Sequence, residues 1–201
     1  MTTALPSLPL GRPRDLTRDA VILEATLDVL AETGYEGMTV EMVATRARAG
    51  KATLYRRWPS KAHLVVAAIA SLSDSNLTLS DVPDTGSLRT DLVALKHATD
   101  NPNITLKMQI LGGLVASLQS DQQLADRVKD DLIRPRSTMM RGLLARAVAR
   151  GEIDPDRDLD ALATLMPAMT FYRCVVLNEP VTVESQECLV EELLLPAAGV
   201  R

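Results

Sequence analysis

Aromatic residues are scarce in this chain of 201 residues: phenylalanine, tryptophan and tyrosine together make up 2% of it. All-β sandwiches and barrels usually contain more aromatic and β-branched residues, so this scarcity favours a helical fold. Cysteine is also rare, and Cys174 and Cys188 cannot form a disulfide framework. We therefore expect an all-α protein whose core forms without disulfides.

Long hydrophobic runs are missing as well. No uninterrupted run approaches the roughly 18 to 20 apolar residues of a membrane span. No basic segment followed by an apolar one marks a secretion signal. From these two features we expect a cytoplasmic protein that has no membrane partner.

Motifs for catalysis and for cofactor binding are absent too. The chain contains no G-x-S-x-G, P-loop or HExxH sequence. Its two histidines, His63 and His97, have no cysteine or second histidine at the spacing of metal ligands. We therefore expect no enzymatic activity, no cofactor and no bound metal.

The chain does contain a local excess of basic residues. Its formal net charge is −4, yet no aspartate or glutamate occurs between Glu41 and Asp74. A basic segment within an acidic chain is typical of a site for an anionic partner, although a solvated charged face has the same composition. The basic residues of this segment are Arg46, Arg48, Lys51, Arg56, Arg57 and Lys61.

Apolar residues recur at the three- and four-residue spacing of amphipathic helices along most of the chain. Thr39 is a candidate N-cap for a short second helix, and Pro59 ends a third that begins at Lys51. Ser60 caps a fourth, and residues 73–87, rich in Ser, Asp, Pro and Gly, form a connection. Further helices are expected at 88–100, 103–119, 121–150, 157–178 and 183–195.

Two short helices joined by a tight turn, the second basic and exposed, predict a helix-turn-helix. If Leu54 marks the inner face of the third helix, Ala52 and Arg56 lie on the opposite face at 100° per residue, with Thr53 and Tyr55 on the flanks. Arginine can contact guanine through two hydrogen bonds. Hydroxyl groups suit phosphate oxygens, which position a protein on DNA without specifying sequence.

At these residues the sequence resembles the tetracycline-repressor (TetR/AcrR) family of bacterial transcription regulators. Arg48 stands where that family has a turn glycine, and Gly50 stands where it has a capping serine. The turn is therefore expected to have a different shape, and the third helix a weaker cap. The matches to the family signature are Gly34, Tyr35, Thr39, Ala44, Ala47, Lys51, Thr53, Leu54, Tyr55 and Lys61.

The resemblance implies a dimeric regulator, usually a repressor, that binds a palindromic operator and releases it when a small molecule binds. It divides the chain into a flexible basic arm (1–16), a helix-turn-helix DNA-binding domain (17–60) and a helical ligand-binding and dimerisation domain (61–201). The expected contacts with double-stranded DNA are Thr39, Lys51, Ala52, Thr53, Tyr55, Arg56, Arg57 and Lys61, with Arg12 and Arg14 of the arm.

The second half is aliphatic and rich in methionine, a side chain that adapts to irregular cavities. Pro135 and Pro167 fall inside predicted helices, and each should kink or interrupt its helix and open space for a ligand. We expect an enclosed cavity for an apolar or amphipathic small-molecule effector. Its candidate lining residues are His97, Met108, Gln109, Leu111, Met139, Met166, Thr170, Tyr172 and Arg173.

The last two predicted helices are apolar on two faces, and a helix of that kind must bury both. One face can pack on the chain's own core, while the other suits a twofold partner in a four-helix interface. We therefore expect a homodimer. The candidate interface residues are Leu162, Leu165, Met169, Leu189 and Leu193.

Two alternatives remain open at the level of sequence. One is a helical protein that binds or sequesters a small molecule and carries a vestigial helix-turn-helix. The other is a DNA-binding regulator that responds to a protein partner and has no ligand. Salt-dependent binding to short palindromic DNA separates the first alternative from a regulator.

Overall fold

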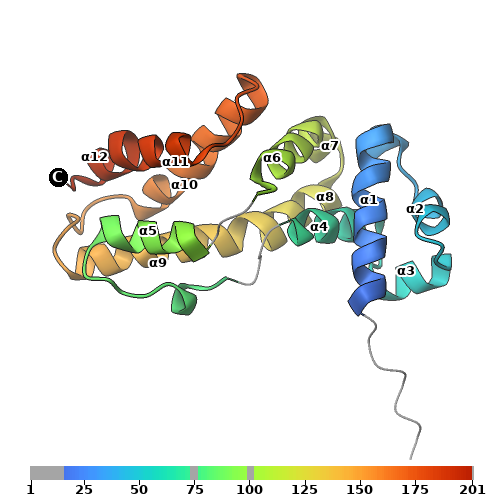
Figure 1. Ribbon diagram of the computed structural model, residues 1–201, viewed down its shortest axis with the longest axis horizontal. Coiled ribbons are helices and arrows are strands. Elements are labelled where there is room, and N and C mark those ends of the chain that lie inside the picture. Colours follow the sequence, from blue (N-terminus) through green and yellow to red (C-terminus); the bar gives the residue numbers. More distant parts are fainter. Residues whose placement is uncertain (1–15, 73–76, 99–101, 201) are drawn as a thin grey trace, which may run out of the picture.

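The computed structural model describes residues 16–72, 77–98 and 102–200. All regular structure in these ranges is helical and none is strand, as the predicted all-α class requires. The N-terminal helices form one end of an elongated molecule, and the C-terminal helices lie toward the other (Figure 1). The first four helices are α1 (Leu16–Gly37), α2 (Val40–Arg46), α3 (Lys51–Arg57) and α4 (Lys61–Ser71).

Local signals set the ends of the N-terminal helices. Regular geometry in α1 stops at Gly34, whose φ of +66° suits glycine. The Thr39 hydroxyl accepts a hydrogen bond from the Met42 amide at 3.2 Å and caps α2. Arg48, in the tight turn, has φ +48°, so a non-glycine residue adopts the conformation for which the family uses glycine. Gly50 precedes α3 and provides no side-chain cap, as expected.

The second half is a continuous series of helices in which three segments have π-helical geometry. Segments η2, η3 and η4 continue α8, α10 and α11 without a gap. The first elements are η1 (Leu79–Asp81, a 3-10 turn), α5 (Leu88–Ala98), α6 (Ile104–Gly113), α7 (Val115–Ser120), α8 (Gln122–Arg127) and η2 (Val128–Ile133). They are followed by α9 (Arg134–Ala149), α10 (Leu159–Phe171), η3 (Tyr172–Val176), α11 (Val183–Leu189), η4 (Val190–Leu194) and α12 (Leu195–Ala198).

One expectation about these helices is wrong. The segment 103–119 is two helices, because the chain turns at Leu114 after two consecutive glycines, which weaken a helix. Pro167 lies inside α10, which is not interrupted and continues to Phe171 while packed along α9. Pro135 behaves as expected, since it lies in the first turn of α9, two residues after the end of the π-helical segment η2. Such segments change the hydrogen-bond register where a proline lacks its donor.

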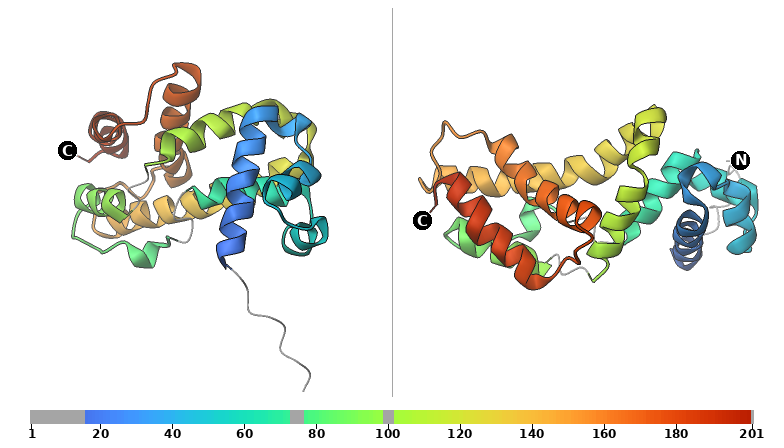
Figure 2. Two further views of the ribbon diagram at one scale, coloured as in Figure 1. Left: turned by 45° about the vertical axis from the view of Figure 1, so that its right-hand side comes forward. Right: turned by 90° about the horizontal axis from the view of Figure 1, so that it is seen from above.

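The helices enclose two hydrophobic cores. The first contains side chains of α1 to α4 together with Leu114, Leu124, Val128 and Leu132 from the second half. The second contains side chains of α5, α9, α10, η4 and α12. Figure 2 shows α2 and α3 beyond α1, at the end remote from α10 to α12. The first core therefore joins the helix-turn-helix to α6 and α8, and α4 packs on both α1 and α8.

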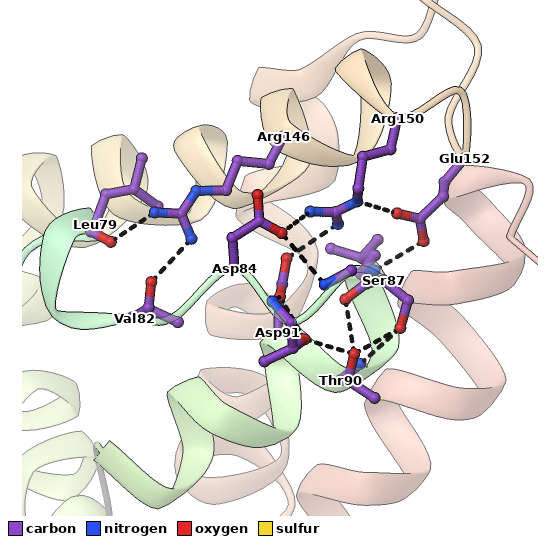
Figure 3. A network of polar contacts seen from close by, with 12 residues as sticks. Leu79, Val82, Asp84, Ser87, Thr90, Asp91, Arg146, Arg150 and Glu152 are labelled. Atoms are coloured by element: carbon purple, nitrogen blue, oxygen red, sulfur yellow. Dashed lines mark hydrogen bonds and ion pairs between the residues drawn. The ribbon is translucent and has the colours of Figure 1, made fainter.

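A polar network fixes the segment before α5 on α9 (Figure 3). The Arg150 guanidinium donates hydrogen bonds to Asp84 at 2.7 Å, Asp91 at 3.0 Å and Glu152 at 2.6 Å. Arg146 donates to the backbone carbonyl oxygens of Leu79, in η1, and Val82, just after η1. Burial alone would raise the pKa of Asp91, but hydrogen bonds from the loop and from Arg150 lower it below its ordinary value. These interactions hold the second half together at its outer end.

Candidate nucleic-acid interface and effector region

Helix α3 presents the face that the sequence predicts. Leu54 is fully buried in the first core and Trp58 packs against that core. Ala52, Tyr55 and Arg56 are exposed on the outside, and Tyr55 retains 41% of its surface. The predicted orientation of α3 is confirmed, and the assignment of these side chains to DNA contacts stays a prediction.

The charges on this face differ in how they are held. Lys51 forms an ion pair with Glu41 of α2, which raises the pKa of Lys51, and its Nζ lies 5.7 Å from the centre of the Tyr55 ring. Within the described ranges, Arg56 has no ion pair with an acidic side chain. The Arg56 guanidinium is therefore the more accessible of the two charges for a base or a phosphate.

Arg57 departs from its predicted role. It points toward α1 and forms an ion pair with Asp19, and the two side chains are 15% and 11% exposed. The partner lies 38 residues earlier in the sequence, so spacing within α3 could not identify it. Arg57 holds α3 on α1 and does not belong to the exposed face. The predicted contacts Arg12 and Arg14 lie outside the described residues.

A polar junction connects the DNA-binding helices to the second half. The Tyr35 hydroxyl donates to Asp121 at 2.7 Å, and Ser117 of α7 donates to Glu36 at 3.0 Å. Lys61, at the start of α4, places its Nζ 4.2 Å from the centre of the Tyr35 ring. Burial, together with the hydrogen bond to Asp121, raises the pKa of Tyr35. The sequence gives no signal for this junction, because its hydrogen-bonded partners are more than 80 residues apart.

The predicted pocket residues are not brought together. His97, Gln109 and Tyr172 are exposed, so these three cannot line one enclosed space with the buried residues. Helical spacing could not locate these positions, because the helices are apolar on more than one side. Among the other candidates, Met108 is half-buried, Leu111 packs on the first core, and Met139 and Met166 belong to the second core. The remaining two form polar contacts within the chain. The buried Thr170 hydroxyl accepts a hydrogen bond from Gln186 at 3.1 Å, and Arg173 donates to Glu179 at 2.8 Å.

A basic side chain that sequence analysis did not select lies inside the second half. Lys107 of α6 is only 6% exposed. Burial and, to a smaller extent, the charge of Arg136 lower the pKa of Lys107 to about 8. Lysine is almost never fully buried in folded proteins, so the residue type alone predicts an exposed position. The available hint was the position of Lys107 between Leu106 and Met108 in α6.

The predicted dimer residues also need correction. Leu162 and Leu189 are buried within their own chain, and Leu165 packs on the second core, because the apolar faces that they mark point inward. Met169 and Leu193 are half-buried. The large apolar side chains that remain exposed nearby are Tyr172 and Val176 of η3, Leu177 just after it, and Val183 at the start of α11.

The helix formed by α10 and η3 is unusually apolar for its degree of burial. Its residues 159–176 have a mean hydropathy of 1.2 over 18 residues, and 22% of them are buried. By length and composition alone this helix could cross a membrane, although Asp160, Thr164 and Arg173 interrupt its apolar run. Asp160 pairs with Arg141 and Arg173 with Glu179, so the helix carries charges near both ends.

Comparison with known proteins identifies the family. Residues 22–68 match the model of the tetR family of bacterial regulatory proteins, and residues 82–193 match the tetracycline repressor-like C-terminal domain. An uncharacterized HTH-type transcriptional regulator of Mycobacterium tuberculosis is 33% identical over 180 residues, covering 90% of this chain and 87% of its own.

Two further proteins share most of their length with this chain. The DNA-binding transcriptional repressor TetR of Mycobacteroides abscessus is 34% identical over 186 residues, covering 90% of this chain and 94% of its own. A TetR-family regulator structure from Rhodococcus sp. has a TM-score of 0.70 at 21% identity, covering 92% of this chain and all of that chain, and supports the fold. The exposed basic helix therefore belongs to a helix-turn-helix, and the chain is a member of the TetR family of transcriptional regulators.

Proposed function

We propose that this regulator is a homodimeric repressor that binds a palindromic operator through α3 and releases it when a small molecule binds in the second half. The observation that carries the proposal is the geometry of α3, in which buried Leu54 fixes Arg56, Tyr55 and Ala52 on the outer surface. A recognition helix must present its polar face in this way to enter the major groove. We place the protein in the cytoplasm, where it would meet operator DNA.

The dimer is proposed to form through the exposed apolar side chains at the end of η3 and the start of α11. Val176 is 63% exposed and Val183 is 53% exposed, on a helix pair that the chain itself covers poorly. Exposed apolar side chains on a poorly covered helix are typical of association sites. A twofold interface there would join two copies through helices other than α3 and leave both copies of α3 free for an operator with twofold symmetry.

The proposal is tested by selecting genomic DNA fragments on the purified full-length protein and sequencing those that are retained. A repressor should enrich one palindromic sequence, and its affinity for that sequence should fall steeply with salt because phosphate contacts release counterions. A protein with a vestigial helix-turn-helix would retain fragments without a shared sequence. A regulator that responds only to a protein partner would bind the palindrome but show no release in a small-molecule screen.

A further inference from the structure

Glu41 is an acidic residue beside the basic helix α3. It lies in the first turn of α2, and no aspartate or glutamate follows it before Asp74. In a helix-turn-helix the first helix crosses the DNA backbone, and the second begins in the major groove. A carboxylate at the start of the first helix would repel the phosphates of a bound duplex, so its presence there needs a physical reason.

The Glu41 carboxylate forms an ion pair with the Nζ of Lys51, the first residue of α3. The two side chains are 56% and 52% exposed, so the pair lies at the surface that a duplex would approach. The hydrogen bond between them lowers the pKa of Glu41 and raises that of Lys51, so both are charged at neutral pH. The ammonium of Lys51 is therefore already neutralised when the protein meets DNA.

Other ion pairs of this domain have a different position. Arg46 of α2 pairs with Glu32, and Arg57 of α3 pairs with Asp19, and both carboxylates belong to α1. These pairs hold α2 and α3 on α1. Glu41 instead joins the start of α2 to the start of α3, so removing its charge leaves the contacts with α1 in place.

The ion pair lies on one flank of α3. Lys51 and Tyr55 are four residues apart and share that flank, and the Lys51 Nζ lies 5.7 Å from the centre of the Tyr55 ring. At 100° per residue, Lys51 is about 140° around the helix axis from Arg56. Arg56 can therefore contact a base from the outer face while Lys51 stays paired with Glu41 on the flank.

We propose that Glu41 is a specificity-determining residue, which keeps Lys51 from neutralising a phosphate of non-operator DNA. Binding to arbitrary sequences depends on phosphate neutralisation, so it is weaker when one ammonium is held by a carboxylate. In the operator complex, base contacts fix the position of α3, and a freed ammonium on the flank gains less there. The inference rests on the proposed recognition of an operator through α3 and specifies how other sequences are disfavoured.

The experiment measures the affinity of the full-length protein for two duplexes of equal length over a series of salt concentrations. One is the palindrome selected from genomic DNA, and the other is a scrambled sequence of the same base composition. Glu41→Gln should raise affinity for the scrambled duplex about fivefold and steepen the slope of log K against log salt by about 0.9, as one added phosphate contact does. Affinity for the palindrome should rise by about twofold or less, so the ratio of the two affinities falls.

Two further variants separate the role of the ion pair from that of net charge. Asp160→Asn is the matched control, because it raises the net charge by the same amount and breaks an exposed ion pair with Arg141 in the second half. It should change neither affinity nor slope. In the Lys51→Met background, Glu41→Gln should no longer steepen the slope, because the ammonium that it frees is absent.

Three results would overturn the proposal: an unchanged slope in Glu41→Gln, an equal gain in affinity for both duplexes, or a steeper slope that persists in Lys51→Met. A gain of the same size in Asp160→Asn would also contradict it. Glu41→Gln should melt within about 4 °C of the wild type, because an exposed ion pair adds little to stability. The scrambled duplex requires no operator, so its salt slopes test Glu41 even if genomic selection yields no palindrome.

Discussion

The two halves of the molecule differ in how directly their residues indicate function. In α3 one buried residue, Leu54, orients the whole helix, and the exposed face follows from helical geometry. Along α10 and η3 apolar residues lie on more than one side, so Leu162 and Leu165 face the chain's own core while Tyr172 of η3 faces solvent. A short amphipathic helix has one possible orientation, whereas a helix that is apolar on two faces has several. The N-terminal function can therefore be localised from sequence, and the C-terminal function requires the structure.

The largest expected effect concerns assembly. Val176→Asp should convert the dimer into a monomer, because a charge at a covered apolar contact has no partner. The monomer should also lose most of its affinity for a palindromic operator, although α3 is unchanged. Sedimentation at micromolar concentration measures the change. Val93→Asp, at an exposed valine of α5, is the matched control and should remain dimeric. A wild-type protein that is monomeric at this concentration would refute the dimer.

Removing the buried charge of the second half should stabilise the protein. Lysine in the unfolded chain titrates near 10.5, whereas burial beside Arg136 lowers the pKa of Lys107 to about 8. The destabilisation is complete below pH 8 and disappears above about pH 10.5, where the side chain is neutral in both states. Lys107→Met should therefore raise the free energy of unfolding at pH 7 by up to about 3 kcal/mol.

Denaturation at two pH values checks this effect. The difference between Lys107→Met and the wild type should shrink when the pH rises from 7 to above 10, because the wild type then loses its buried charge. A variant that is less stable than the wild type at pH 7 would show that Lys107 is a structural residue. Arg56 provides a comparison: its charge is exposed, so removing that charge should have little effect on stability.

Two adjacent glycines of α6 should respond in opposite directions. A Cβ at Gly112 would lie 2.6 Å from Val175 Cγ1, and valine is stiff, so Gly112→Ala should destabilise the protein by about 1–3 kcal/mol. A Cβ at Gly113 meets no atom within 4 Å, so Gly113→Ala should be neutral or stabilising by about 0.5–1 kcal/mol. Thermal unfolding of the pair measures both changes. Equal effects would mean that α6 does not pack tightly on η3.

On the DNA side, Arg56→Ala should relax the base preference by about 1–3 kcal/mol at one position of each half-site. Lys61→Ala should instead weaken binding to all sequences and reduce the slope of log K against log salt by about 0.9. Competition binding with point-mutated operators distinguishes the two. Arg157→Ala, at an exposed arginine of the second half, should change neither. An unchanged base preference in Arg56→Ala would remove this residue from sequence recognition.

Sequence predicted the features that depend on local interactions. The capping hydroxyl of Thr39, the helix stop at Gly34 and the inward face of Leu54 involve residues within one or two turns. It failed where distant residues meet. The pairing of Arg57 with Asp19 and the burial of Lys107 depend on how separate helices pack, and composition does not encode that packing.

The smallest effect is expected in the turn before α3. Arg48 adopts φ +48°, a conformation that destabilises a residue with a Cβ by roughly 1 kcal/mol. Glycine would remove this strain, but its greater freedom in the unfolded chain would cancel part of the gain in stability. Arg48→Gly should therefore raise stability by about 0.5 kcal/mol. It should also lower affinity for DNA, because the exposed guanidinium beside the recognition helix is lost.

Asn178 is the matched position in the second half, with φ +55° just after η3. Asparagine tolerates this conformation well, so Asn178→Gly should change neither stability nor DNA affinity by a measurable amount. Melting temperatures and operator titrations of the two variants test the pair together. A gain in stability without a loss of affinity in Arg48→Gly would show that the strained turn serves no role in DNA binding. Strain at Arg48 would then be a property of the fold alone.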